Sequence, residues 1–477
     1  MKLDLTTLQQ AVNGSAAAFR CRRKLQPGGG AGDKVFPPTF AGAVYAVEQR
    51  RVRDEKGNLR PDPVTCVVLD TVQSQANRME QALQDALDGG RIKIPVLKVD
   101  FSDWSPTGQK PDTEKFVDDV GIITSLQVPH RLADAILRDS QTKEGTPFRK
   151  SDKGKALNVV SQRNATALYQ LCPTALIFGM WDSTGPKGGL GAKFERAMVS
   201  EVIGVGATFG VKTASRIDPL ITKTEGIEIF KGKDGGWTLD KSTAETDANG
   251  KPIYLGKGEK RGKVSNANLG NVLPTFAEYG KGANGPDILK VQQLSDARFN
   301  LLLDNPDALK QLEARKGQMA AGGASVEYAE QLTTLSLIVL RRLCLPIIKR
   351  KNEKDEDFAK RKAGAEQAGR VVLAALGLCA ATLAFESGLA LRSRCLLWPE
   401  EALTWELLDK PGAEKQPQFS ITGKDAISLL EQSVAAANTL GLKWEDNPIK
   451  LFPNAELAKL VLKSQEMMQG GAEEETE

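Results

Sequence analysis

The sequence Val64-Thr-Cys-Val-Val-Leu69, followed by Asp70-Thr-Val-Gln-Ser-Gln-Ala-Asn-Arg-Met-Glu80, decides the predicted fold class. The first six residues are almost fully apolar, which predicts a strand. The next segment places Val72, Ala76, Met79 and Leu83 on one helical face, so a helix is expected after the strand, with Asp70 as its N-cap. Gly89-Gly90 is predicted to end this helix.

A second predicted strand, Ile92 to Phe101, follows the helix. The order strand, helix, strand is the first half of an RRM-like (ferredoxin-like) unit. Further patterns predict a strand from Phe40 to Val47, helices from Pro129 to Asp139, Tyr328 to Leu345 and Gly369 to Glu386, and a closing strand from Leu391 to Trp398. This mixture indicates an α+β protein.

The composition limits how the chain could attract a polyanion. Its 477 residues are 41% hydrophobic and 26% charged, and 64 Lys and Arg residues against 60 Asp and Glu residues give a net charge of only +4. Nucleic-acid binding therefore requires locally clustered cations, such as Arg20, Arg22 and Arg23, although a solvated basic stretch is an alternative interpretation of that cluster. Aromatic residues make up 6% of the chain, which argues against base stacking as the main mode of binding.

The six cysteines are widely spaced and form no Cys-x-x-Cys pair. This usage is typical of reduced, buried cysteines in a cytoplasmic protein, and no signal peptide is recognised at the start of the sequence. The most apolar run, Val371 to Phe385, is too short to span a bilayer and is predicted to be a core helix. We therefore expect a cytoplasmic location and no membrane partner.

His130 is the single histidine of the sequence. A two-histidine metal site is therefore excluded, while a metal nuclease built on carboxylates stays open. In the context Pro129-His130-Arg131, a packing residue at the start of a helix is a better interpretation than a catalyst.

A glycine-rich segment is the main functional signal. The apolar run Ala175 to Phe178 predicts a strand; glycines 185, 188, 189 and 191 follow, and a helix is predicted with Lys193 and Arg196 in its first turns. Uncovered backbone N–H groups, a helix N-terminus and these cations, with Lys187, suit an anionic phosphate backbone. The spacing excludes a P-loop and a dinucleotide fingerprint, since no Gly-Lys pair precedes Ser or Thr and Phe194 stands where a third glycine belongs. A turn that only lets a strand and a helix pack closely is the alternative.

The predicted helix after Asp70 carries a second candidate surface. Its first two turns contain Gln73, Ser74, Gln75, Asn77 and Arg78. Pairs at i,i+4 give the helix a polar face, whose amides and arginine can donate to phosphates and ribose hydroxyls. A solvated helix face is the alternative. More cations follow in a predicted polar loop from Arg138 to Lys155 and at Arg216.

Several longer segments resemble one known family. They are Asp70–Glu80, Pro129–Ser140, Asn164–Val205, Ser215–Leu220, Tyr328–Arg342 and Leu391–Cys395. In order and in sequence they resemble the CRISPR RAMP family that forms the backbone of type I-G (formerly I-U) Cascade, a GSU-type family of CRISPR-RNA-binding proteins. The segment Lys263-Val-Ser-Asn-Ala-Asn-Leu-Gly-Asn271 departs from the family pattern, because it lacks an expected Glu and His.

The resemblance implies an α+β fold with an RRM-like (ferredoxin-like) palm and large helical and hairpin insertions. The implied regions are an N-terminal segment with the first half of the palm (1–101), helical fingers that end in the glycine-rich loop (102–205), a palm strand with a probable thumb (206–285), the second half of the palm (286–405), and a C-terminal helical region with a disordered acidic tail (406–477). The long segment Thr222–Gly285 and the 140–155 loop are the two candidates for the thumb.

The resemblance also implies a binding role without catalysis. CRISPR RNA, target DNA reached through the guide, other copies of the chain, other Cascade subunits and a separate helicase-nuclease are the implied partners, and no cofactor or metal is expected. Residue patterns and resemblance together predict these RNA-binding residues: Arg20, Arg22, Arg23, Gln73, Ser74, Gln75, Asn77, Arg78, His130, Arg131, Arg138, Lys187, Gly188, Gly189, Lys193, Arg196 and Arg216.

Two other functions stay open. A backbone subunit like those of type III complexes would cut RNA with a loop carboxylate and a metal ion, and Asp182 and Asp218 are its candidates. A processing endonuclease would have only His130 as its histidine general base.

Overall fold

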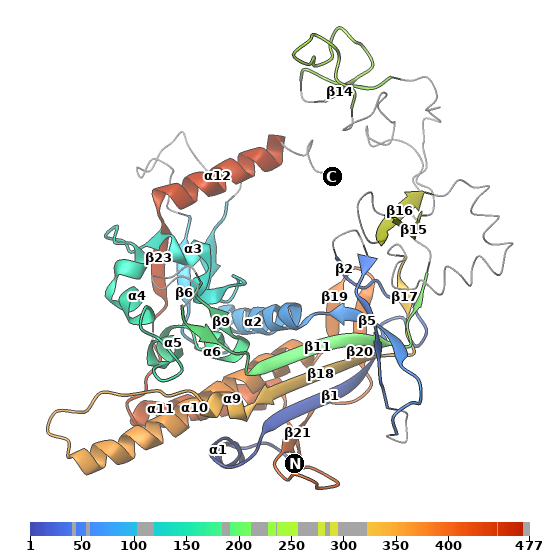
Figure 1. The fold of residues 1–477 in the computed structure, drawn as a ribbon. Coiled ribbons are helices and arrows are strands. Elements are labelled where there is room, and N and C mark those ends of the chain that lie inside the picture. The colour runs from blue at the N-terminus through green and yellow to red at the C-terminus, as the bar shows by residue number, and fades with distance from the viewer. Residues whose placement is uncertain are drawn as a thin grey trace. The chain divides into compact units, whose positions relative to one another are not determined.

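The computed structural model describes residues 1–40, 44–53, 58–102, 119–183, 191–210, 228–234, 236–255, 275–281, 287–293, 322–445 and 447–470. The chain divides into two compact units. The first comprises Met1–Val35, Gln49–Ala207 and Val326–Lys463, and the second comprises Phe36–Glu48, Thr208–Ser325 and Ser464–Glu477. Helices and antiparallel strands occur together, which agrees with the predicted α+β class (Figure 1). The five-region division of the sequence stays a prediction.

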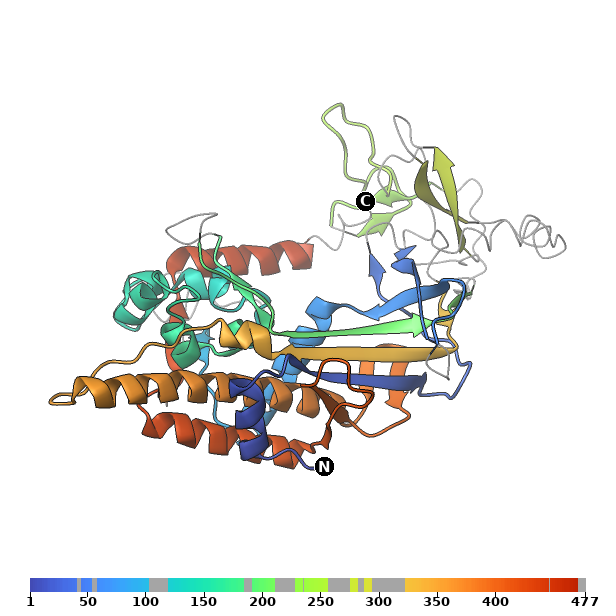
Figure 2. The ribbon, with the colours of Figure 1, turned by 60° about the horizontal axis from the view of Figure 1, so that its bottom comes forward.

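The main sheet contains nine strands within the described residues. The path runs through β19 (Leu389–Arg392), β20 (Cys395–Pro399), β1 (Ala18–Pro27), β18 (Tyr328–Ser336), β11 (Met198–Val205), β5 (Val64–Asp70) and β4 (Val47–Arg50). In addition, β21 (Thr404–Leu408) pairs with β1, and β22 (Gln418–Ser420) pairs with β21. From β20 to β5 all neighbours are antiparallel. The long strands β1, β18 and β11 lie side by side in Figures 1 and 2.

The basic stretch near the N-terminus is a central strand of this sheet. In β1, Arg22 is paired with Leu332 and Arg23 with Gln331 of β18. Successive side chains of a strand point to opposite faces. Arg22 is therefore exposed, whereas Arg23 is only 2% exposed. The interpretation of this stretch as solvated is wrong for Arg23.

The segment from Tyr328 to Leu345 is mainly a strand and not the predicted helix. Residues Tyr328–Ser336 form β18, which is paired on both sides, and only the short helix α9 (Leu337–Arg341) follows. The segment contains the helix-forming residues Ala329, Glu330 and Gln331, but pairing with β1 and β11 overrides this local preference.

The predicted strand and helix from Val64 to Asp88 are confirmed. β5 is followed by α2 (Val72–Asp88), which ends at Gly89. The N-cap is Thr71 and not Asp70, because the Thr71 hydroxyl accepts a hydrogen bond from the Ser74 N–H. Asp70 is instead buried and bound to other side chains.

A long helix, α10 (Asp355–Phe385), packs against α2 and the main sheet, while α1 (Leu5–Asn13) and α11 (Gly423–Thr439) pack against α10 (Figure 2). It begins well before the predicted Gly369. Among the described residues, α10 is the one helix long and apolar enough to cross a membrane, but 78% of its most apolar window is buried inside the protein. It is therefore a core helix, as predicted.

The strand after α2 belongs to a different sheet from β5. β6 (Leu97–Asp100) pairs in parallel with β23 (Ile449–Pro453) and antiparallel with β7 (Ile122–Thr124), and β8 (Ser140–Gln141) pairs with β23. The neighbour of β6 on the side away from β7 is therefore β23, from the C-terminal part of the chain, and not β5. The prediction that the Ile92–Phe101 strand completes a unit with Val64–Leu69 is wrong.

Two other sequence predictions are corrected by short elements. The expected strand from Phe40 to Val47 is broken into β2 (Thr39–Phe40), β3 (Val44–Tyr45) and the start of β4. The expected closing strand is the hairpin of β19 and β20, whose turn contains Arg394 at a φ of 55°.

The second unit consists of small antiparallel pairs in its described part. β12 (Thr208–Phe209) pairs with β17 (Ala324–Ser325), β13 (Phe230–Lys231) with β14 (Trp237–Thr238), and β15 (Thr275–Lys281) with β16 (Asp287–Gln293). Phe230 of β13 also forms an isolated antiparallel bridge with Tyr254. The last helix, α12 (Ala455–Gly470), belongs to the first unit up to Lys463.

Candidate nucleic-acid interface

The described residues on either side of the glycine-rich segment form two short helices followed by two paired strands. α5 (Thr166–Leu171) and α6 (Thr174–Phe178) precede β9 (Met180–Trp181), and β10 (Lys193–Phe194) leads into β11. The strand predicted at Ala175–Phe178 is wrong, because a short buried apolar run fits either type of element. The helix predicted at Lys193 and Arg196 is also wrong: β10 pairs with β9, so the phosphate argument loses its helix N-terminus.

Arg131 and Glu80 attach the start of the β9–β10 hairpin to α2. Arg131 lies in the short helix η1 (Arg131–Ala133), and its Nε and one terminal nitrogen each donate to a carboxylate oxygen of Glu80 at 2.7 Å. The other terminal nitrogen donates to the carbonyl of Gly179 at 2.9 Å. Both charged side chains are almost fully buried. Sequence analysis assigned Arg131 to RNA, but its guanidinium is occupied inside the protein.

Gly179 allows the chain to turn from α6 into β9. Its φ is 82°, and a Cβ at this position would lie 3.0 Å from Cγ of Arg196 and 3.1 Å from the Phe194 carbonyl oxygen. A larger residue is disfavoured both by the backbone conformation and by the close approach. Glycine at this position therefore lets the Arg196 side-chain stem and the Phe194 carbonyl approach the end of α6 closely.

A second arginine holds the next residues of the hairpin. Asp182 is 5% exposed, and its carboxylate lies 3.1 Å from a terminal nitrogen of Arg149. Its backbone N–H donates to the carbonyl of Ala192 at 3.0 Å. Arg149 belongs to η2 (Phe148–Lys150), so part of the predicted polar loop 138–155 supports this hairpin.

Two exposed cations lie on or next to the β9–β10 hairpin. Lys193 and Arg196 are both exposed, and Lys193 pairs across the hairpin with Trp181. The Lys193 ammonium lies 5.6 Å from the centre of the Trp181 ring. Lys193 on β10 and Arg196 in the connection from β10 to β11 retain the charge that the glycine-loop prediction required, but neither lies on a helix.

The predicted polar face of α2 is divided in two by burial. Gln73 and Asn77 are exposed, and Ser74 is half-buried. Gln75 is completely buried and faces the main sheet. Gln75 is therefore not part of an exposed RNA-binding face, although Gln73 and Asn77 stay candidates.

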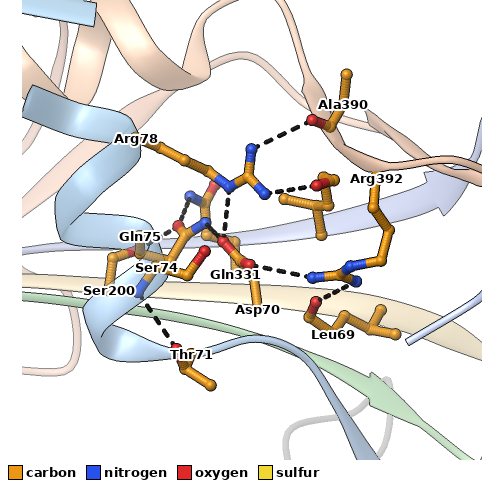
Figure 3. A network of polar contacts seen from close by, with 11 residues as sticks. Leu69, Asp70, Thr71, Ser74, Gln75, Arg78, Ser200, Gln331, Ala390 and Arg392 are labelled. Atoms are coloured by element: carbon orange, nitrogen blue, oxygen red, sulfur yellow. Dashed lines mark hydrogen bonds and ion pairs between the residues drawn. The ribbon is translucent and has the colours of Figure 1, made fainter. Parts of the chain in front are cut away.

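Arg78 and Gln75 belong to a polar network at the start of α2 (Figure 3). Nε2 of Gln75 and Nε of Arg78 donate to the same Asp70 oxygen at 2.6 and 2.9 Å. Arg392 lies 3.3 Å from the other oxygen of Asp70. Arg78 also donates to the carbonyls of Ala390 and Leu391, so it attaches α2 to the β19–β20 hairpin.

The same network continues from α2 to three strands of the main sheet. Oε1 of Gln75 accepts hydrogen bonds from Ser200 of β11 at 2.9 Å and from Gln331 of β18 at 3.0 Å (Figure 3). Gln331 in turn accepts a bond from Arg23 of β1 at 2.8 Å. Burial lowers the pKa of Arg23. Arg23 and Gln75 thus join strands and helices, and neither lies on an RNA-accessible surface.

The other two N-terminal arginines pair with glutamates. Arg20 donates through Nε and a terminal nitrogen to Glu406 at 2.9 and 2.5 Å, and Arg22 pairs with Glu330. The hydrogen bond to Glu330 raises the pKa of Arg22. Both arginine side chains stay partly exposed, but carboxylates compensate their charge.

The predicted helix from Pro129 to Asp139 is split into η1 and α3 (Ala135–Arg138). His130 stands at the N-cap position of η1 with an exposed side chain, so a packing role for it is wrong. Arg138 makes a two-pronged contact with Asp139 at 3.0 and 2.7 Å, which raises the pKa of Arg138.

Four predicted residues, Lys187, Gly188, Gly189 and Arg216, lie outside the described residues. The alternative catalytic residue Asp218 and the divergent segment Lys263–Asn271 lie outside them as well. The contacts of Glu80, Arg149 and Arg392 were not predicted, because their partners are distant in the sequence. Trp181 was also missed, although the alternation Met180-Trp181-Asp182 before the glycines could have indicated it.

All six cysteines lie in the described part of the chain as free thiols, and five of them are buried. The prediction of reduced, buried cysteines is therefore confirmed apart from the half-buried Cys344. Within the same described part, no group of three or more His, Cys, Asp or Glu side chains is placed to hold a metal ion.

Comparison with known proteins finds a similarity to one family in part of the chain. Residues 19–209 match the family model described as CRISPR-associated protein GSU0053 (Cas_GSU0053). The matched region contains β1, α2, the β9–β10 hairpin and β11, and it supports a CRISPR-associated family for this chain. No curated protein matches the chain.

Proposed function

We propose that this chain is a CRISPR-RNA-binding backbone subunit of a type I Cascade, of subtype I-G and the RAMP superfamily. The observation that carries the proposal is the match of residues 19–209 to a CRISPR-associated family, since every described RNA-binding candidate lies within that match. In this role the chain binds guide RNA without cutting it, in the cytoplasm. Copies assemble along the guide, support its base pairing with target DNA, and work with other Cascade subunits and a helicase-nuclease.

The chain order of six elements supports an RRM-like palm. β1, α2, β11, β18, α10 and β20 follow one another as strand, helix, strand, strand, helix, strand, and their spatial order β20-β1-β18-β11 corresponds to 4-1-3-2. This is the antiparallel order of a ferredoxin-like unit. The first strand of that unit is β1, and β5 adds to the edge formed by β11.

The charges favour the hairpin and the exposed part of α2 as the guide-binding surface. Lys193 and Arg196 are exposed at the β9–β10 hairpin, whereas Arg20 and Arg22 of β1 are matched by glutamates. Guide binding that ignores sequence requires contacts to phosphate and sugar, which exposed cations and amides such as Gln73 and Asn77 provide. Exposed His130, at the start of η1, is a further candidate, whereas Arg138 is matched by Asp139.

The RNA-cutting alternative is weakened at one of its two candidate residues. Asp182 is buried and engaged by Arg149, so binding a catalytic metal there requires the loss of that ion pair. Asp218 lies outside the described residues. The proposal of a non-catalytic role therefore needs a direct assay.

The proposal is tested by purifying the full chain with a co-expressed guide and sequencing the RNA that it protects. We expect guide RNA of defined length, and light scattering should show mass increasing in steps as the guide is lengthened. Labelled target RNA with Mg²⁺ is then incubated with the assembled complex. Intact target RNA supports the binder, whereas a fixed pattern of cuts that disappears in Asp218→Ala supports the RNA-cutting alternative. A chain that binds no RNA contradicts both.

A further inference from the structure

Trp181 is a large apolar side chain held out from the protein. Its side chain is 55% exposed, although its neighbours Met180 and Asp182 are buried. Alternation along β9 explains the direction, because successive residues of a strand point to opposite faces. Exposing an indole forgoes the free energy of its burial, so a position that holds it outward merits a functional explanation.

The backbone on both sides of Trp181 is fixed. Two residues earlier, the carbonyl of Gly179 accepts a hydrogen bond from buried Arg131 at 2.9 Å. One residue later, Asp182 is bound by Arg149 through its side chain and by Ala192 through its backbone N–H. The backbone that carries the ring is therefore pre-organised, which reduces the entropy lost when a ligand binds.

The chemistry next to the ring suits a nucleotide. Lys193 lies across the hairpin, with its ammonium 5.6 Å from the ring centre, and exposed Arg196 follows two residues after β10. An aromatic plane beside cations provides stacking for a base and charge for its phosphate.

Two other exposed tryptophans serve as comparisons. Trp398 in β20 has the same exposed fraction, 55%, and Trp237 in β14 is 47% exposed. Neither has a cation over its ring among the contacts of the described residues. Exposure alone therefore does not single out Trp181, whereas exposure with an anchored backbone and an adjacent cation does.

We propose that Trp181 is a stacking platform for one unpaired base of single-stranded RNA, with Lys193 contacting the phosphate beside that base. The inference rests on the proposed RNA-binding function and deepens it by naming a base contact. A single platform in each subunit is compatible with the low aromatic content of the chain. It contacts the π-face that all bases share, so it does not select a sequence.

The test compares Trp181→Ala and Trp181→Phe with Trp398→Ala, which removes an equally exposed indole. Binding of a fluorescent single-stranded RNA of guide length is measured over a series of salt concentrations. Because Trp181→Ala loses one stacked base, its affinity for the RNA should be about 5- to 150-fold lower than that of wild type. The affinities of Trp181→Phe and Trp398→Ala should stay close to that of wild type. The salt slope of Trp181→Ala should not change, because a stacked base releases no counterion.

A second readout uses RNA that contains 2-aminopurine, whose fluorescence falls when the base is stacked. Wild-type protein should quench one or more probe positions, and Trp181→Leu, at saturating protein, should restore their fluorescence. Wild-type affinity in Trp181→Ala, an equal loss in Trp398→Ala, or unchanged quenching in Trp181→Leu overturns the inference while leaving the proposed function intact. A wild-type chain that binds no RNA contradicts the proposed function itself.

Discussion

The guanidinium of Arg131 and the carboxylate of Glu80 face each other through two hydrogen bonds of 2.7 Å, and both side chains are buried. This pair links η1 to α2 across 51 residues of sequence. Arg131 has an unusual φ of 52°, and its third contact holds the carbonyl of Gly179. One buried ion pair therefore connects the helix carrying Gln73 and Asn77 to the hairpin carrying Lys193.

Breaking this pair should be costly. Arg131→Ala leaves a buried carboxylate without its partner, which typically destabilises a protein by about 3–5 kcal/mol. The matched control is Arg138→Ala, since the ion pair of Arg138 with Asp139 is only half-buried and should be worth no more than about 1 kcal/mol. Urea denaturation of both variants measures the difference. Equal stabilities would mean that Arg131 is not an anchor.

The same pair should make stability depend on pH. Burial raises the pKa of Glu80 from 4.5 to about 7, although Arg131 opposes the rise. Between these values the folded protein binds more protons at this site than the unfolded chain. The contribution of Glu80 to the free energy of unfolding should therefore fall from pH 4.5 to pH 7 and stay constant above it. Urea denaturation at pH 5, 6, 7 and 8 should show that Glu80→Gln removes this dependence, and a stability difference between variant and wild type that is independent of pH would contradict it.

The structure changes what is expected from charge reversal on α2. Arg78→Glu places a second carboxylate against buried Asp70 and removes two contacts to the β19–β20 hairpin, so we expect destabilisation on the order of 3 kcal/mol. Gln73→Glu adds a new negative charge on the same helix but at an exposed position. The free energy of unfolding of this variant should stay within about 0.5 kcal/mol of the wild-type value.

RNA binding separates these two variants further. If α2 faces the guide, Gln73→Glu weakens RNA binding at low salt and does so less at high salt, because salt screens the repulsion. Thermal melting and fluorescence anisotropy on the same samples provide both measurements. Unaltered RNA affinity in Gln73→Glu would remove the exposed part of α2 from the interface.

The sequence predicted β5 and α2 well because both have strong local patterns. It misassigned β18, where Ala329, Glu330 and Gln331 favour a helix, because strand pairing with partners more than a hundred residues away decides the structure. It also misassigned α6, since five buried residues in a row carry no periodicity that distinguishes helix from strand.

The candidate site was predicted less completely than the fold. Glycines and cations indicated the hairpin region, and Lys193 and Arg196 are indeed exposed there. Residue type alone could not show that Arg23, Gln75 and Arg131 are buried, since each is a polar side chain whose partners lie on another element. Burial of such groups requires long-range hydrogen bonds that leave no local signal.

The cysteines give an independent test of the packing. Burial raises the pKa of Cys21 to about 11 and that of Cys379 to about 12, so their reactive thiolates are scarce at pH 8. Cys344 is half-buried, and we expect iodoacetamide to modify it first in the native protein. Mass spectrometry over time measures the order, with a urea-unfolded sample as the control. Equally fast labelling of Cys379 would contradict the burial of α10.

The salt dependence of RNA binding tests whether the hairpin cations contact phosphates. Lys193 and Arg196 are exposed on either side of Phe194, so truncating them should leave the buried core intact. Each phosphate contact of a single strand contributes about 0.7 to the slope of log affinity against log salt, so Lys193→Ala/Arg196→Ala should reduce the magnitude of the slope by about 1.4. Lys410→Ala/Lys415→Ala removes the same net charge from the exposed connection between β21 and β22 and is the matched control. Filter binding between low and high salt measures both slopes. A shallower slope in the hairpin variant alone locates the guide backbone at β10, whereas equal slopes in both variants mean that only the overall charge of the protein attracts RNA.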